Sequence, residues 1–581
     1  MATDPRNKDG SSAKISTVEP EQQTDESLNV ENVIEPEKTP SNLNPTELPN
    51  SPKYLTPKEL TWISIAFTVA TWMLALDISI LATAIPHITT QFNSLPDVGW
   101  YGSAYLLGEM ASQPTWGRVY TFFDNKLTYI LTLVIFEIGS VISAAAPNSI
   151  ALILGRTVSG IGGAGMLCGS LAIFGQSVPL KKRPWGMALV TSMYTIASLI
   201  GPTLGGLFTD VEKLGWRFCF WINLPSGALC IGITWWVLKN QAAPSADLPL
   251  RKKLQMLDFE GAFLLMTALV CLFLALTWGG DKYPWSNVKV YGCLIGFALL
   301  SGVFIALQAY KKEKATIPLR ILLPRTVLLS CLFNFLYSVA SITHGYYIAF
   351  YFQSGRGSSA ALSGAKGLPY AVAAGICTLI SGYSMSSNGY YVPFMWAGAA
   401  IYAIAAGLLT TLTIDSGAGM WVGYLIIAGI GFGLSVQIPF IAVQVVLPSA
   451  DMPIACAWVV FFRAFGGAIG VAIAQNIFTT NLVKKLLQIP GLDIKTVLGA
   501  GAANVGLEKI VQPDMLRLVR GAYVFGVTKA FWLPVGVLCA AFVCSLGMER
   551  KRIMDEDEIE AVETRETGER ATEMVEVKGV A

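Results

Sequence analysis

Among the ionisable side chains inside long apolar stretches of this sequence, four point to proton chemistry by their types and positions: Asp77, Glu109, Arg156 and His344. An ionisable group at membrane depth is costly, so it usually faces a watery cavity or a partner. The carboxyl groups of Asp77 and Glu109 and the imidazole of His344 can each exchange a proton. Arg156 cannot lose its charge, so it needs a carbonyl or carboxylate partner and can hold the charge of a neighbouring acid. We expect proton coupling by Asp77 and Arg156, with Glu109 and His344 as further candidates.

Structural alternatives remain open for each of these residues. Asp77 could hydrogen-bond to a neighbouring helix, Arg156 could anchor on backbone carbonyls, Glu109 could face water and His344 could be a buried histidine with satisfied hydrogen bonds. We expect Glu137 to support helix packing against Arg156. Several polar residues at membrane depth are candidates for lining a cavity that binds a transported molecule: Glu137, Asn334, Gln437, Gln444, Arg463 and Gln475.

Fourteen apolar stretches of about 20 residues must position these side chains, and each can cross a hydrocarbon core of roughly 30 Å as a helix. The composition agrees, because 53% of the residues are hydrophobic and only 14% are charged. The net charge of +2 gives no signal for nucleic-acid binding. We therefore expect an all-α polytopic membrane protein. The stretches lie near residues 61–85, 99–120, 127–146, 149–175, 185–208, 217–238, 258–278, 289–310, 326–353, 361–384, 391–412, 417–440, 453–478 and 529–548.

An internal repeat appears when the chain is compared with itself at an offset of 269 residues. Gly160 and Gly162 then meet Gly429 and Gly431, and Pro184 meets Pro453. The offset superposes the fourth and fifth stretches on the twelfth and thirteenth, which predicts two six-helix halves with two inserted helices. The expected organisation is an N-terminal cytoplasmic tail at 1–57, a first half at 58–240, two linker helices at 241–325, a second half at 326–548 with a long outer loop at about 479–528, and a cytoplasmic tail at 549–581.

The loop charges predict the orientation of the chain in the membrane. Lys and Arg accumulate on the cytoplasmic side of short loops. The loops on the side of the two tails carry 14 of these residues, and the short loops on the other side carry 6. Both termini are therefore expected in the cytoplasm. We expect the plasma membrane, with the vacuolar membrane as the alternative.

Four motif regions carry a resemblance to a known family. They are Leu76–Pro86, with Asp77 before an apolar run; Gly117–Lys126, at a basic loop; Leu154–Gly165, with Arg156 before a glycine-rich face; and Ser198–Gly206, with Gly201, Pro202, Gly205 and Gly206. Through about residues 58–548 the chain resembles the fourteen-spanner drug:proton antiporters of the major facilitator superfamily, and within them fungal exporters of toxins and other secondary metabolites.

The resemblance implies a role for each motif. Gly117 and Lys126 frame a gating loop, although Thr121 and Phe122 replace the acidic and first basic residue of the family pattern. In the last motif, Pro202 bends the helix and the glycines allow close packing, which forms a hinge that is associated with export rather than import.

The expected function is proton-coupled efflux of a bulky amphipathic molecule, such as a toxin, secondary metabolite or drug, by alternating access. No Walker-type phosphate loop occurs, so the proton gradient is the expected energy source, with no cofactor. We expect neither an enzyme nor a metal site, since the chain has only 2 histidines and no ligand cluster. The expected partners are the bilayer, the cargo and protons, without an obligate protein partner, so we expect a monomer. A proton-coupled importer of the siderophore type and a nutrient sensor remain the alternatives.

Overall fold

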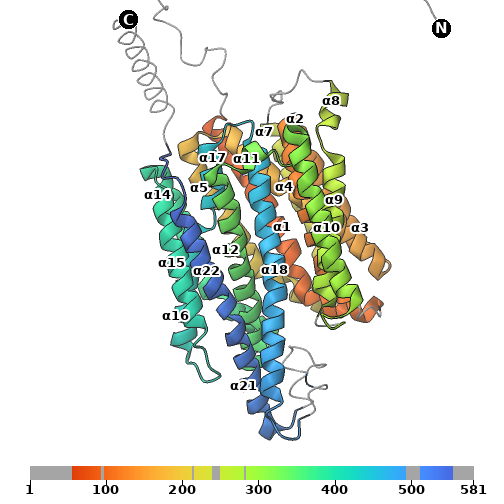
Figure 1. The fold of residues 1–581 in the computed structure, drawn as a ribbon, viewed down its shortest axis with the longest axis vertical. Helices are drawn as coiled ribbons and strands as arrows, with labels where there is room; N and C mark the ends of the chain where they lie inside the picture. Colours follow the sequence, from red (N-terminus) through yellow and green to blue (C-terminus); the bar gives the residue numbers. More distant parts are fainter. Residues whose placement is uncertain are drawn as a thin grey trace, which may run out of the picture. The chain divides into compact units, whose positions relative to one another are not determined.

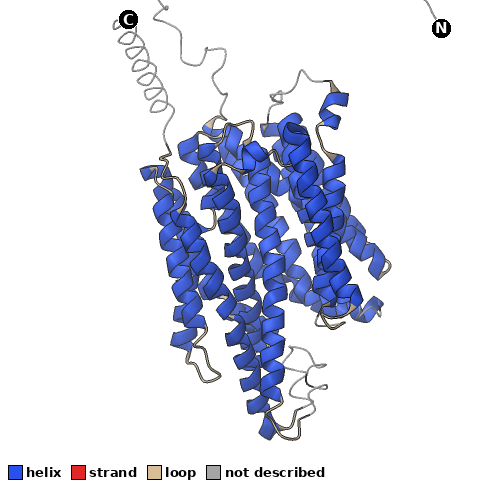
Figure 2. Ribbon diagram, in the orientation of Figure 1, coloured by secondary structure: helices blue, strands red, loops and turns tan. Residues whose placement is uncertain are grey.

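The computed structural model describes residues 55–92, 97–211, 215–238, 249–279, 283–492, 497 and 511–553. Residues 1–54 and 554–581, which make up most of the two expected cytoplasmic tails, lie outside the described residues. The described part consists of helices and connecting loops, without a strand (Figure 2).

The first half packs around α4, the glycine-rich helix, which lies against both α2 and α3, while α1 lies against α5 and α7. Side chains cap two of these helices: Asp124 accepts a hydrogen bond from Leu127 N at 2.9 Å, and Asn148 accepts one from Ala151 N at 2.9 Å. The helices are α1 (Pro57–Phe92), α2 (Val98–Phe122), α3 (Asn125–Ala144), α4 (Ser149–Ser177), η2 (Leu180–Lys182), α5 (Arg183–Asp210), α6 (Phe218–Trp221) and α7 (Asn223–Val237).

Two long helices form the linker between the halves. They pack side by side, and α9 also lies against α2 of the first half (Figure 1). The linker comprises α8 (Leu250–Gln255), α9 (Phe259–Trp278), α10 (Val288–Lys311), η3 (Lys312–Lys314) and α11 (Leu319–Leu322).

The second half packs around α12 and α18, which run side by side, and around α16, which lies against α14 and α15 (Figure 1). Its elements are α12 (Arg325–Phe350), η4 (Tyr351–Gly355), α13 (Ala360–Lys366), α14 (Leu368–Asn388), α15 (Val392–Leu409), α16 (Ala418–Ser435), α17 (Ile438–Val446), α18 (Met452–Leu486), α21 (Pro513–Ala530) and α22 (Trp532–Leu546).

The expected number of fourteen spans is not confirmed. Within the described residues, twelve helical segments are long and apolar enough to cross a membrane, or thirteen if the two parts of the bent α5 count as one span. Helix α2 matches the expected stretch 99–120 but is not among them, because Glu109, Gln113 and several glycines and serines lower its hydropathy. The expected loop at 479–528 is also partly helical, since α18 continues to Leu486 and α21 begins at Pro513.

The repeat predicted from glycines recurs in the packing of both halves. A Cβ on Gly160 would lie 2.2 Å from the carbonyl oxygen of Tyr105, and one on Gly429 would lie 2.3 Å from that of Tyr370. Likewise, Gly162 lies against the backbone of Phe136, and Gly431 against that of Tyr402. Equivalent glycines therefore allow equivalent close helix contacts in the two halves.

The two halves meet at one end of the bundle, which we call the basic-loop end because Lys181 and Lys182 of η2 and Arg183 at the start of α5 lie there. Helix α5 packs on α14, and α18 packs on α2 and α4. Trp185 N donates to Ser386 Oγ at 3.2 Å, and Arg183 Nη1 lies 3.8 Å from Met452 Sδ. These contacts close the interface between the halves at this end.

Candidate functional site

The structure brings together Asp77 of α1 and Arg156 of α4, the two residues expected to couple protons. Arg156 Nη1 donates to Asp77 Oδ2, and the two side chains are 1% and 0% exposed. Arg156 Nε also donates to the carbonyl oxygen of Tyr101 at 3.2 Å. The guanidinium lies 4.7 Å from the ring centroid of Tyr105, which adds a cation–π contact. The charge of each partner is thus balanced inside the first half.

Asn223, at the start of α7, completes this ion pair. Its Nδ2 donates to Asp77 Oδ1 at 3.2 Å and to Ser140 Oγ of α3 at 3.2 Å. Side chains of α4 and α7 therefore bond to the Asp77 carboxylate of α1, and their further bonds reach α2 and α3. Sequence reasoning did not select Asn223 as a site residue; the available signal was a polar side chain within the apolar start of a membrane helix.

The glycine and proline motif of α5 has two different faces. A Cβ on Gly201 would lie 1.9 Å from Ser79 Oγ, and one on Gly205 would lie 2.5 Å from the carbonyl oxygen of Ile80, so both glycines contact α1. A Cβ on Gly206 would have nothing within 4 Å. Only part of the motif therefore serves close packing against α1.

The bend expected in this motif is present. The segments Leu180–Ser198 and Ile200–Thr209 meet at 42°. Pro202 has no N–H for the carbonyl oxygen four residues earlier, and the helix bends where that bond is missing.

The two residues that frame the predicted gating loop, Gly117 and Lys126, have different surroundings in the structure. Gly117 lies at the contact between the halves, because a Cβ there would lie 2.7 Å from Ala457 Cβ and 3.1 Å from the carbonyl oxygen of Pro453. Lys126 Nζ instead lies 4.8 Å from the ring centroid of Trp235 in the first half. Gly117 is thus part of the closed interface, whereas Lys126 packs within its own half.

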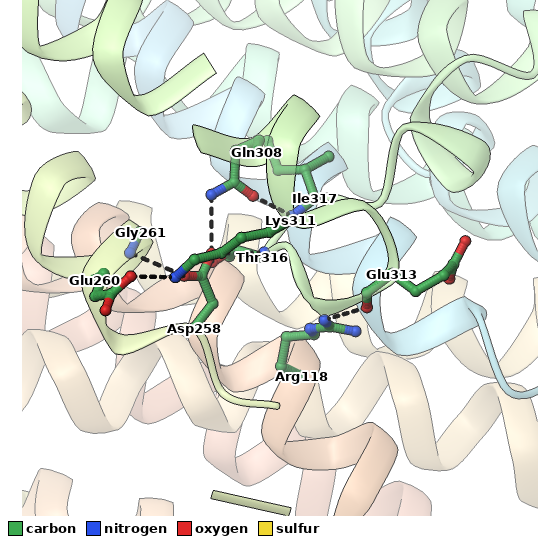
Figure 3. Close-up of polar contacts among 9 residues, drawn as sticks. All are labelled: Arg118, Asp258, Glu260, Gly261, Gln308, Lys311, Glu313, Thr316 and Ile317. Atoms are coloured by element: carbon green, nitrogen blue, oxygen red, sulfur yellow. Dashed lines mark hydrogen bonds and ion pairs between the residues drawn. The ribbon is translucent and has the colours of Figure 1, made fainter. Parts of the chain in front are cut away.

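Asp258 is the centre of a buried network at the basic-loop end. Its carboxylate accepts hydrogen bonds from Gln308 Nε2 at 2.9 Å, Lys311 Nζ at 2.7 Å and Thr316 N at 2.9 Å (Figure 3). Asp258 also has a left-handed backbone conformation with φ of 38°, which is uncommon for a residue other than glycine. The network ties the start of α9 to the end of α10.

The segment after α10 connects the two halves through four side chains that we call the linker bridge: Arg118, Glu313, Arg320 and Asp451. Arg118 Nη2 at the end of α2 donates to the carbonyl oxygen of Glu313 at 2.7 Å (Figure 3). Arg320 donates to Glu313 Oε1 at 3.3 Å and to both carboxylate oxygens of Asp451, just before α18, at 2.7 and 3.1 Å. Asp451, and then Glu313, raise the pKa of Arg320 above its usual value, so the bridge keeps its cation.

Two opposite charges face each other between the halves. Glu109 of α2 and Arg463 of α18 are close enough to interact electrostatically, and the Arg463 guanidinium lies 5.4 Å from the ring centroid of Tyr194 on α5. All three side chains are only partly covered, and so is Leu106, one turn from Glu109. Glu109 and Arg463 form no ion pair with each other among the described residues. This group of residues therefore presents an acid, a cation and an aromatic ring between the two halves.

His344 and most of the other polar candidates lie inside the second half. His344 Nδ1 is 3.1 Å from Tyr402 Oη, Asn334 Nδ2 donates to the carbonyl oxygen of Val459 at 3.1 Å, and Gln437 Nε2 lies 3.2 Å from Ser381 Oγ. These bonds hold neighbouring helices together.

Gln475 and Gln444 differ in what they join. Gln475 Oε1 accepts a hydrogen bond from Tyr347 Oη at 2.9 Å, again within the second half. Gln444 Nε2 lies 3.7 Å from Met187 Sδ, across the interface at the basic-loop end. Two of the predicted cavity residues in the second half contact the first half: Arg463 lies against Tyr194, and Gln444 lies against Met187.

Glu137 does not pair with Arg156 as expected, because Asp77 and Tyr101 occupy that guanidinium. It lies instead at the contact between α3 and α7, against Gly227.

Known proteins resemble this chain in sequence and in fold. The profile of the Major Facilitator Superfamily matches residues 67–471. The MFS-type transporter ltbE of Aspergillus luteorubrus is 43% identical over 88% of this chain and 93% of its own length. The efflux pump roqT of Penicillium rubens is 39% identical over 86% and 92% of the two chains. The structure of the proton:xylose symporter XylE has a TM-score of 0.58 at 13% identity, covering 87% of this chain and 99% of that one.

Proposed function

This chain belongs to the Major Facilitator Superfamily, and we propose that it is a proton-coupled exporter of a bulky amphipathic molecule. The family makes it a multi-pass membrane transporter. Export is supported by relatives such as roqT, whose name is efflux pump, and by the glycine and proline motif of α5. We further propose that its cargo is a secondary metabolite, toxin or drug, and that it works in the plasma membrane.

The observation that carries the proton coupling is the buried Asp77–Arg156 pair. A carboxylate at membrane depth is stable only while a cation or a proton balances its charge. A movement that separates Arg156 from Asp77 would therefore be accompanied by proton binding to Asp77. Because Asn223 and Tyr101 also hold the pair, shifts of α2 and α7 relative to α1 and α4 would change that balance.

The cargo is proposed to bind between the halves, near Glu109, Tyr194 and Arg463. The aromatic ring and the apolar neighbours suit an amphipathic molecule, and the two charged side chains suit its polar groups. We assign the basic-loop end to the cytoplasm, as the loop charges favour. The closed contacts at that end then correspond to a state that would release cargo outward and accept protons from outside.

Purified protein in liposomes tests this function, with the amphipathic dye rhodamine 6G as the probe. A pH gradient should drive dye transport by the wild type and by Asp415→Asn, a control at an exposed surface ion pair. Asp77→Asn should lose the gradient-driven transport while eluting as a folded monodisperse protein. Undiminished transport by Asp77→Asn would remove Asp77 from the mechanism, and an absence of pH-driven dye movement by the wild type would contradict the proposed function.

A further inference from the structure

Glu137 is an acid at membrane depth whose side chain is partly buried and whose carboxyl group has no hydrogen-bonding partner in the described part of the chain. It lies 12 residues after the first residue of α3, which places it about 18 Å along that helix. Both of its carboxyl oxygens are buried, and neither has a hydrogen-bond partner among the described residues. Such a group is rare in folded proteins and calls for an explanation.

Gly227 of α7 leaves the space that this carboxyl group occupies. A Cβ on Gly227 would lie 1.8 Å from Glu137 Oε1 and 2.5 Å from Glu137 Cδ. Any larger residue at 227 would therefore displace the acid from its position. The contact between α3 and α7 is shaped around the carboxyl group rather than around an apolar side chain.

The charges near Glu137 do not stabilise a second anion. The negative charge of Asp77 on α1 acts on Glu137 and disfavours a second negative charge there. Cys230 is a titratable neighbour of Glu137 on α7. Arg156 of α4 is occupied by Asp77 and by the carbonyl oxygen of Tyr101. An isolated carboxylate in such apolar surroundings is far less stable than the neutral acid. The two acids and the single arginine are together electrically neutral only when one proton is bound.

We propose that Glu137 is a second proton-carrying group of this transporter and holds a proton in this conformation, while Asp77 stays ionised against Arg156. The inference rests on the proposed function and adds a residue to it. A proton from solution binds a carboxylate oxygen of Glu137 to give the neutral acid, and its release restores the carboxylate.

The network of hydrogen bonds around the ion pair reaches α3 one helical turn from this acid. Ser140 lies one helical turn after Glu137 on α3, and its hydroxyl accepts a hydrogen bond from Asn223 Nδ2, which also donates to Asp77. Movement of α3 or α7 against α1 would therefore change the surroundings of both acids at once. This arrangement links the protonation of Glu137 to the Asp77–Arg156 pair.

Infrared difference spectroscopy of the reconstituted full-length protein tests the protonation directly and needs no cargo. The wild type at neutral pH should show the carbonyl stretch of a buried protonated carboxylic acid. That signal should decrease in Glu137→Gln and persist in the control Glu260→Gln, which replaces an exposed acid. Glu137→Asp should retain the signal at a shifted frequency. An unchanged signal in Glu137→Gln would overturn the proposal, whatever the transport assays show.

Transport of rhodamine 6G then separates a proton-carrying role from a merely structural one. Glu137→Gln resembles the protonated state, so it should still exchange dye across liposomes without a gradient. Accumulation driven by a pH gradient should fall at least tenfold. Wild-type accumulation in Glu137→Gln would overturn the inference and leave the proposed function intact, whereas a lack of gradient-driven transport by the wild type would count against the proposed function. If exchange and accumulation fall together, the role is structural and the inference also fails.

Discussion

Two adjacent glycines of α5 should respond in opposite ways to the same substitution. A Cβ on Gly205 would lie 2.4 Å from Thr83 Oγ1 and 2.5 Å from the carbonyl oxygen of Ile80, whereas one on Gly206 would have nothing within 4 Å. Alanine gains about 1 kcal/mol over glycine inside a helix, and this gain applies to both sites. Gly205→Ala must also push α1 and α5 apart, which costs about 1–3 kcal/mol. The two variants should therefore differ in free energy of unfolding by about 1–3 kcal/mol, with Gly206→Ala the more stable.

The assay is unfolding of both purified variants in mixed micelles of lipid and detergent under identical conditions. Because the helix-propensity term cancels between the neighbours, the measured difference reports the contact with α1 alone. Gly205→Ala should also slow pH-driven dye transport, since α1 carries Asp77, while Gly206→Ala should transport like the wild type. Equal stability of the two variants, or a greater loss in Gly206→Ala, would refute this account of the motif.

Two further predictions concern the charged contacts. Asp77→Asn should destabilise the protein by about 3–5 kcal/mol, because it leaves Arg156 buried without a counter-charge, and adding Arg156→Gln should recover part of that loss in the same unfolding assay. Strictly additive effects would show that the two residues are uncoupled. Arg320→Gln removes the contact with Asp451, so spin labels on the basic-loop ends of α5 and α14 should report a roughly twofold to fivefold shift towards separated halves, as expected for a pair worth about 0.5–1 kcal/mol. An equal shift in Arg517→Gln, which breaks an unrelated surface pair, would argue against the linker bridge.

Much of the fold could be predicted from the sequence, because apolar length and glycine spacing are local properties. The expected stretches at 127–146 and 149–175 correspond to α3 and α4 within two residues at each end. That Arg156 has a carboxylate or carbonyl partner also follows from local reasoning, since a permanently charged arginine at membrane depth needs one. The count of fourteen spans stays unconfirmed, because α2 is helical at the expected place but is not among the twelve segments that are long and apolar enough to cross a membrane.

The contacts between elements far apart in the sequence could not be predicted. Glu137 was expected against Arg156, but which acid reaches an arginine depends on the docking of α1 and α3 on α4. Arg320 and Asp451 meet only because the linker passes over the contact between the halves. Gly205 and Gly206 are identical in type, and only the position of α1 distinguishes them.

The most direct test of proton-coupled export is transport by the wild-type protein in liposomes before and after an ionophore removes the pH gradient and the membrane potential. The account predicts that rhodamine 6G moves against its concentration gradient while protons move in the opposite direction, and that this movement stops when the ionophore is added. Uphill movement of the dye at the same rate after that addition would contradict it.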